Sequence, residues 1–315
     1  MFVAFFKCLR PKQWIKNLLL FAGILFAGRW NDAALVINVL VGFLVFCALS
    51  GVVYITNDIL DVEKDREHPK KRLRPIASGA ISANAAAAGG LVLLAGALAA
   101  AWWITPSFFI CSVIYVLLVT AYSFKLKHMV ILDIMVLAMG FVVRAMAGIE
   151  ALHEEALKAN PVAVTPYFIL TTLFLALFLA IAKRRNELVI LGDGAGAHRQ
   201  VLNDYSTEFC DVILTVATTG VIFSYALWAT SGAFQVGGAL ARQAGSPAAP
   251  AGAGDAYSMA FTMPFVLYGI FRYLWLVFKK DEGGAPEVVL LTDKPLLATV
   301  FLWMVTVVAI LYRNS

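Results

Sequence analysis

The chain has 315 residues, of which 61% are hydrophobic and only 14% are charged. This composition lies outside the range of soluble globular proteins and indicates an integral membrane protein. The net charge of +5 follows the loop pattern described below, so it gives no argument for nucleic-acid binding. The four cysteines show neither CxxC spacing nor the His spacing of a zinc site, and we expect them to be packing residues.

Nine apolar stretches have about the length that a helix needs to cross roughly 30 Å of hydrocarbon. They cover residues 17–29, 35–56, 82–104, 107–123, 131–150, 165–182, 212–232, 257–278 and 295–312. The first is short and begins beside Trp14 and Lys16, which we interpret as interfacial anchors, since no small-residue cleavage site of a signal peptide follows. The expected fold is therefore all-α, a polytopic membrane protein whose residues 1–315 form a single transmembrane domain.

Lys and Arg gather in alternate loops, and this orients the helices because cytoplasmic loops carry the excess of these residues. With the N-terminus inside, nineteen of them lie in cytoplasmic segments and four on the opposite side, while Arg144 and Arg272 lie within spans. The loops after spans two, four, six and eight then face the cytoplasm, where their charged ends can line one cavity. Any soluble substrate is expected to be a cytoplasmic metabolite.

The second span ends in Asn57, Asp58, Asp61 and Asp65. On a helix these spacings of three and four put all four side chains on one face. Carboxylate and amide oxygens suit Mg²⁺, which also keeps positions for water and substrate phosphate. A solvated helix end is the alternative, but four such groups on one face favour a bound cation. We expect all four to be metal ligands, with Asp58 and Asp61 essential for catalysis.

A basic run follows this motif, and it supplies candidate phosphate ligands. Lys71 and Arg74 are the best of them, because they are three residues apart and Pro75 fixes the chain just beyond. Arg can bind a phosphate through two parallel hydrogen bonds, whereas Lys acts as a point charge. Because cytoplasmic loops are basic in any case, some of these charges can also be mere topology signals.

Spans four and five contribute further polar residues. Tyr122, Lys127 and Asp133 lie where span four ends and span five begins. A snorkelling anchor explains Lys127 as well as substrate binding does, whereas Asp133 lies just inside an apolar helix. Arg144 is eleven residues deeper, where a charge is costly unless it faces a partner or a water-filled cavity. We expect it to line the cavity, with a structural ion pair as the alternative.

The loop after span six carries a third set of candidates for binding substrate phosphate: Lys183, Arg184, Glu187 and Arg199. The consecutive cations 183–185 match the need to neutralise a second phosphate group, although topology alone also explains them. Asp204 and Glu208 are four residues apart, and whether they hold a second Mg²⁺ stays open.

The motif Asn57-Asp-x-x-Asp61-x-x-x-Asp65, followed by Arg74-Pro75-Ile76-Ala77-Ser78-Gly79, resembles the UbiA superfamily of membrane prenyltransferases. The resemblance covers the whole chain at the level of topology. It implies nine transmembrane helices around a cavity that opens laterally to lipid, and Mg²⁺ that binds a diphosphate.

One departure from the family pattern points to a branch within it. Aromatic prenyltransferases of the family carry a second Asp-x-x-x-Asp motif after span six, where this chain has Lys183-Arg184-Arg185-x-Glu187-Leu188. With residues 66–77 and 140–145, this segment looks like the decaprenyl-phosphate phosphoribosyltransferase branch. That branch implies 5-phosphoribosyl 1-pyrophosphate as the donor and a polyprenyl phosphate lipid as the acceptor. Three anionic groups must then be neutralised, which fits extra Lys and Arg in place of a second carboxylate set.

Two other functions are compatible with parts of this pattern. One is an aromatic prenyltransferase that uses a polyprenyl diphosphate and an acid such as 4-hydroxybenzoate. The other is a transporter or channel that binds an organic phosphate without reacting, which gives no reason for metal ligands beside a phosphate site. The resemblance further implies a bacterial inner (cytoplasmic) membrane protein with its active site facing the cytoplasm and a role in cell-envelope synthesis. No sequence motif indicates the length of the lipid or the oligomeric state.

Overall fold

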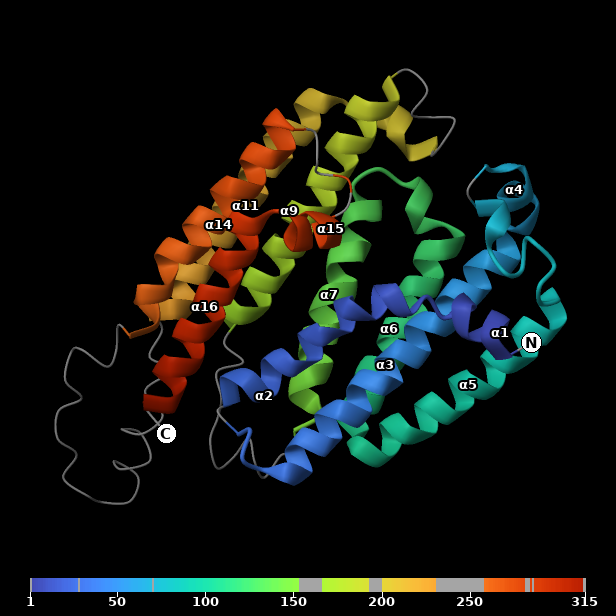
Figure 1. The fold of residues 1–315 in the computed structure, drawn as a ribbon, viewed down its shortest axis with the longest axis horizontal. Helices are drawn as coiled ribbons and strands as arrows, with labels where there is room; N and C mark the ends of the chain where they lie inside the picture. The colour runs from blue at the N-terminus through green and yellow to red at the C-terminus, as the bar shows by residue number, and fades with distance from the viewer. Residues whose placement is uncertain are drawn as a thin grey trace. The chain divides into compact units, whose positions relative to one another are not determined.

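The computed structural model describes residues 2–27, 29–69, 71–152, 166–192, 200–230, 258–280, 284 and 286–313. All regular elements in this part of the chain are helices, which confirms the all-α prediction. Eight of them are long and apolar enough to span a membrane. They are α3 (Ala33–Leu60), α5 (Ala83–Ile104), α6 (Pro106–Phe124), α7 (Leu132–Glu150), α9 (Pro166–Leu191), α11 (Thr207–Thr230), α14 (Met263–Lys279) and α16 (Lys294–Arg313) (Figure 1). The span of α14 begins at Met259, in the 3₁₀-helix η7 (Ser258–Thr262) that precedes it. They correspond to the predicted spans two to nine.

The first predicted span, residues 17–29, falls on two shorter elements. A 3₁₀-helix, η1 (Pro11–Leu20), leads into α2 (Phe21–Ala27), and a short helix α1 (Phe2–Cys8) precedes them. At about 2.0 Å per residue in η1 and about 1.5 Å in α2, the pair reaches about 30 Å. Residues 11–27 therefore have the length of a span although neither element does alone, and the ninth span stays a prediction.

The chain divides into two compact units, which we describe separately. The first contains Met1–Ile24, Arg29–Phe124 and Val143–Glu154. In it α3 packs against α5, α6 and η1, and α5 packs against α6 (Figure 1). The prediction of one domain over residues 1–315 stays a prediction.

Two glycines let backbones approach closely in the first unit. A Cβ atom on Gly148, in α7, would lie 2.1 Å from the carbonyl oxygen of Leu20, and one on Gly23 would lie 2.6 Å from the carbonyl oxygen of Gly148. Only hydrogen atoms fit in these gaps. The junction of η1 and α2 therefore lies directly against α7.

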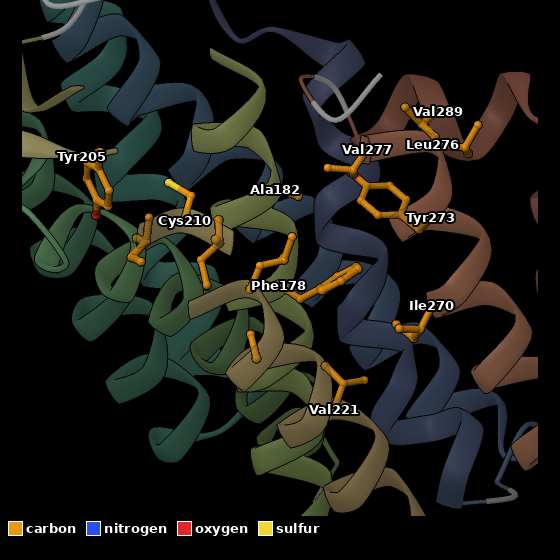
Figure 2. Close-up of a cluster of buried hydrophobic side chains, with 14 of the residues drawn as sticks. Phe178, Ala182, Tyr205, Cys210, Val221, Ile270, Tyr273, Leu276, Val277 and Val289 are labelled. Carbon is orange, nitrogen blue, oxygen red and sulfur yellow. The ribbon is translucent and has the colours of Figure 1, made fainter. Parts of the chain in front are cut away.

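The second unit contains Leu25–Gly28, Lys125–Val142 and Glu155–Ser315. In it α9 packs along α11, and α14 packs against α11 and α16. Its main core joins side chains of α9, α11 and α14 with that of Tyr205, which lies just after the short helix η5 (Gln200–Asp204). Figure 2 shows Phe178, Cys210, Val221 and Tyr273 in this cluster.

Short elements connect the spans near the predicted polar loops. After α3 come α4 (Val62–Glu67) and η2 (Lys71–Leu73), and η3 (Leu126–His128) lies between α6 and α7. Ser82 caps α5 through a hydrogen bond to its side chain from the amide of Ala85, at 3.2 Å, which confirms the predicted start of span three. The Gly- and Ala-rich segment 233–256 lies outside the described residues. The four cysteines are buried and unbridged, as expected of packing residues.

Candidate active site

Two buried carboxylates and two arginines form an ion-pair cluster at the end of α3. Asp58 and Asp65 are 2% and 1% exposed. Arg10 donates to Oδ1 of Asp58 at 2.5 Å, and Arg74 donates to the same oxygen at 3.1 Å and to Oδ2 of Asp65 at 2.5 Å. Buried charges persist only when they are paired, and here two positive groups balance two negative ones. The structure thus brings together three predicted site residues and adds Arg10.

The helical repeat at the end of α3 sets the position of the two carboxylates. The amide of Asp61 donates to the carbonyl of Asn57 at 2.9 Å, and that of Asp65 to the carbonyl of Asp61 at 2.8 Å. These bonds carry the repeat across the break at Asp61, between α3 and α4, so Asp58 and Asp65 lie two turns apart on one side. α3 ends at Leu60 and α4 begins at Val62, but Asp58 and Asp65 keep the helical spacing that the sequence predicts.

A compact turn returns Arg74 to α3. The amide of Ser78 donates to the carbonyl of Arg74 at 2.9 Å, and Arg66 of α4 donates through Nε to the carbonyl of Ala77 at 3.4 Å. Gly79 has a φ of 77°, a left-handed conformation that glycine adopts without strain. The turn that includes Pro75 and Gly79 therefore positions Arg74.

The remaining predicted metal and phosphate ligands of this region lie around the cluster. Asn57 and Asp61 are half-buried, and Lys71 is exposed. Among the residues that the structure describes, no three Asp, Glu, His or Cys side chains converge as a metal site. The all-oxygen donor set does fit a hard cation such as Mg²⁺ by its chemistry. The metal ligands Asn57, Asp58, Asp61 and Asp65 therefore stay a prediction.

Arg10 is the member of the cluster that sequence reasoning missed. It lies 48 residues before Asp58, and its guanidinium sits 4.6 Å from the ring centroid of Tyr54. Its backbone is left-handed, with φ 51° and ψ 64°, just before Pro11. The only signal in the sequence is a basic stretch before the first span, which topology explains equally well.

Arg144 lies inside a buried polar network of the first unit. It is 7% exposed, and it donates to Oδ1 of Asn17 at 2.8 Å and to the hydroxyl of Tyr115 at 2.7 Å. The amide of Asn17 in turn donates to Ser50 and to the sulfur of Cys47, both at 3.3 Å. At least two of the hydrogen bonds that Arg144 donates therefore go to neutral side chains, one on η1 and one on α6. Its predicted role in phosphate binding stays a prediction.

A second buried charged network lies in the second unit and centres on Asp133, which is fully buried. Its Oδ2 accepts a bond from Nε of Arg184 at 2.8 Å, and its Oδ1 accepts one from the hydroxyl of Tyr205 at 2.7 Å. Arg184 also donates to Oε2 of Glu187 at 2.6 Å. Burial, and then the neighbouring Asp133, raises the pKa of Tyr205 well above its ordinary value, so its hydroxyl remains a donor. These residues tie α7, α9 and the segment after η5 together.

The other cations near the end of α9 differ in their surroundings. Arg185 donates to Asp211 at 2.5 Å and lies 4.2 Å from the ring centroid of Phe278, whereas Lys183 is exposed. Exposed residues also include Asp204 and Glu208, and Tyr122 and Lys127 are half-buried. Arg199 lies outside the described residues. Arg272, which lies within the eighth predicted span, pairs with Asp293 at 2.8 Å.

Replacing Arg184 by Lys is expected to lower the free energy of unfolding by about 2 kcal/mol, because one ammonium cannot keep both charged hydrogen bonds in a buried site. Thermal unfolding of the purified protein in detergent measures the loss. The neighbouring Lys183→Met, at an exposed position, serves as the control and should leave the melting temperature unchanged. Equal melting temperatures for both variants would show that the Arg184 pairs add no stability.

The described part of the chain defines an integral membrane protein of many helices, with buried ion pairs where helices end. Comparison with known proteins gives the family. The model of the UbiA prenyltransferase family matches residues 18–305, so the chain belongs to this family. The predicted resemblance is thereby confirmed.

Curated relatives place the chain within the family. It is 34% identical over 313 residues to a decaprenyl-phosphate phosphoribosyltransferase of Mycolicibacterium smegmatis, covering 97% of this chain and 92% of the relative. It is 36% identical over 312 residues to the protein of the same name from Corynebacterium glutamicum, covering 97% and 86%. The predicted resemblance to this branch is confirmed, and the chain is a transferase similar to these enzymes.

Solved structures agree on the fold. A UbiA homolog from Archaeoglobus fulgidus, bound to GPP and Mg²⁺, matches with a TM-score of 0.67 and 18% identity, over 98% of this chain and 99% of that one. At this identity the likeness establishes the shared fold.

Proposed function

We propose that the protein transfers a 5-phosphoribosyl group from 5-phosphoribosyl 1-pyrophosphate to a polyprenyl phosphate and releases pyrophosphate. The observation that carries this proposal is the similarity, over nearly the full length, to enzymes named decaprenyl-phosphate phosphoribosyltransferase. The basic segment 183–185 lies within the last turns of α9 and not in a loop after it. It takes the place of a second aspartate motif and supports the same donor.

The Asp58–Arg74 cluster, comprising Arg10, Asp58, Asp65 and Arg74, suits the binding of a metal-bound pyrophosphate. Mg²⁺ held by Asp58, Asp65 and their neighbours Asn57 and Asp61 would supply neutralisation of the leaving pyrophosphate. The two guanidiniums now neutralise the carboxylates, and contact with pyrophosphate oxygens would give them a second set of charge-assisted bonds. The cluster therefore provides both kinds of group that a diphosphate requires.

The reaction itself needs little acid or base chemistry. The bond from the anomeric carbon to pyrophosphate breaks, and a phosphate oxygen of the lipid attacks that carbon from the opposite face, so the product is inverted. A phosphate monoester is already largely ionised at neutral pH, so no general base is required. The task of the protein is to hold and orient anionic groups, and Lys71, Lys127, Arg144 and Lys183 are our candidates for the donor and acceptor phosphates.

We further propose that the N-terminus and the site face the cytoplasm. The distribution of Lys and Arg supports this orientation, because it puts the excess on that side. Cytoplasmic 5-phosphoribosyl 1-pyrophosphate then reaches the site directly.

Removal of divalent metal is expected to abolish transfer. Treatment of the purified protein with EDTA should lower the rate to background, since the leaving pyrophosphate would then lack the neutralisation that the metal supplies, and added Mg²⁺ should restore it. The rate of pyrophosphate release measures both steps. Transfer that continues undiminished in EDTA would contradict the proposed metal.

The identity of the donor is tested in membranes that contain the protein. One reaction receives labelled 5-phosphoribosyl 1-pyrophosphate and a polyprenyl phosphate, and the other receives a polyprenyl diphosphate and 4-hydroxybenzoate. Label in the lipid extract of the first reaction supports the proposal. Turnover in the second reaction alone would move the diphosphate to the lipid and overturn it.

A further inference from the structure

The backbone of Ile131 adopts a conformation that a β-branched residue rarely takes. Its φ is 67°, in the left-handed region. The amide of Leu132 donates to the carbonyl of Val130 at 2.8 Å, so the chain turns sharply around Ile131 just before α7 begins. Ile131 is 45% exposed, so packing of its side chain does not explain why the backbone is held in this conformation. Something other than this side chain must hold the turn.

The hydroxyl of Tyr205 holds the turn from a segment far away in the sequence. It accepts a hydrogen bond from the amide of Ile131 at 2.8 Å and donates one to Oδ1 of Asp133 at 2.7 Å. Tyr205 is 6% exposed and Asp133 is fully buried, so water does not readily replace either bond. One hydroxyl therefore fixes both the strained amide and the start of α7.

The hydroxyl of Tyr205 and its two partners, Ile131 and Asp133, form a clamp. This clamp is rigid because a third element also holds Asp133. Arg184 of α9 donates to its other carboxylate oxygen, at 2.8 Å. Three elements of the second unit thus meet at one carboxylate and one hydroxyl. Such a network keeps a strained backbone only where the surroundings fix it from several sides.

The segment that the clamp holds in place carries Lys127. The helix η3, with Lys127 and His128, directly precedes the turn, and it contacts η5, which leads into Tyr205. We propose that Tyr205 is a positioning residue, whose hydroxyl keeps Ile131 left-handed and so holds Lys127 in place to bind a phosphate of the phosphoribosyl donor. This inference rests on the proposed function and adds to it a residue that acts on binding of the donor, not on the chemical step.

The test compares Tyr205→Phe with Tyr225→Phe in the full-length protein, using 5-phosphoribosyl 1-pyrophosphate and a polyprenyl phosphate. Both changes remove one buried hydroxyl with two hydrogen bonds and keep the ring, and Tyr225 bonds Thr262 and Trp303 at 2.5 and 2.8 Å. For Tyr205→Phe we expect KM for the donor to rise about five- to tenfold while kcat changes less than about twofold. Tyr225→Phe should leave the donor KM unchanged.

A glycine at position 131 separates positioning from general stability. Glycine adopts the left-handed conformation without strain, so Ile131→Gly combined with Tyr205→Phe should return the donor KM close to that of the wild type. Loss of a purely structural bond would not be rescued in this way.

Other results of these experiments would count against the inference or the proposed function. An unchanged donor KM in Tyr205→Phe, or equal losses of kcat in the two Phe variants, would overturn it. If Tyr205→Phe does not accumulate, Lys127→Met tests the same idea at a half-buried surface residue, and an unchanged donor KM there would also overturn it. Absence of phosphoribosyl transfer by the wild type would instead refute the proposed function.

Discussion

Replacing Asp61 by Asn is expected to lower phosphoribosyl transfer by at least about 100-fold, because loss of a metal ligand removes several kcal/mol of stabilisation from the leaving pyrophosphate. Asn has nearly the same shape, so the backbone bonds that join α3 to α4 at this residue remain. The rate of label transfer to lipid and the Mg²⁺ concentration that gives half of the maximal rate measure the effect. The Mg²⁺ requirement should rise as the rate falls.

Glu63→Gln is the matched control for this change. Glu63 lies two residues further along the chain, its side chain is 81% exposed, and it pairs with Arg66 at 3.1 Å. An exposed ion pair adds little to stability, and we assign this residue no role in binding. Near wild-type transfer by Asp61→Asn, or an equal loss in both variants, would contradict a specific role for Asp61.

Replacing Gly148 by Ala is expected to lower the free energy of unfolding by about 3 kcal/mol. The added Cβ would lie 2.1 Å from the carbonyl oxygen of Leu20, and because that atom belongs to the backbone, η1 and α7 must move apart. The same movement would disturb the bond between Asn17 and Arg144, which joins these two elements. Thermal unfolding in detergent should show a melting temperature lowered by more than about 5 °C.

Gly96→Ala provides the comparison for Gly148→Ala. Gly96 lies within α5, and a Cβ there would meet nothing within 4 Å. Since Ala favours a helix over Gly by up to about 1 kcal/mol, this variant should be as stable as the wild type or slightly more stable. A normal melting temperature for Gly148→Ala would show that the close approach of Leu20 and Gly148 is not needed for the fold.

The sequence predicted the membrane helices well because their signal is local. Eight of the nine predicted spans match long apolar helices, since the length and hydropathy of a stretch suffice to identify it. The structure of the first span was harder to predict, because residues 11–20 form a 3₁₀-helix that hydropathy does not distinguish from an α-helix. Local spacing likewise predicted that Asp58 and Asp65 share one side of a helix end.

The partners of the predicted site residues could not be read from the sequence. Arg10 reaches Asp58 across 48 residues, and Tyr205 reaches Asp133 across 72. Arg184 was predicted to bind phosphate from its place in a basic run, but the structure shows it buried between Asp133 and Glu187. A run of cations looks the same whether each member faces substrate, solvent or a buried acid. Only tertiary structure separates these cases.

The most direct measurement of the central claim uses the purified protein in lipid nanodiscs with labelled 5-phosphoribosyl 1-pyrophosphate, a polyprenyl phosphate and Mg²⁺. Labelled lipid and released pyrophosphate are measured in the same reaction. We predict that they appear in equal amounts and that both are lost in Asp61→Asn. Pyrophosphate released without labelled lipid, or no turnover of this donor at all, would contradict the account.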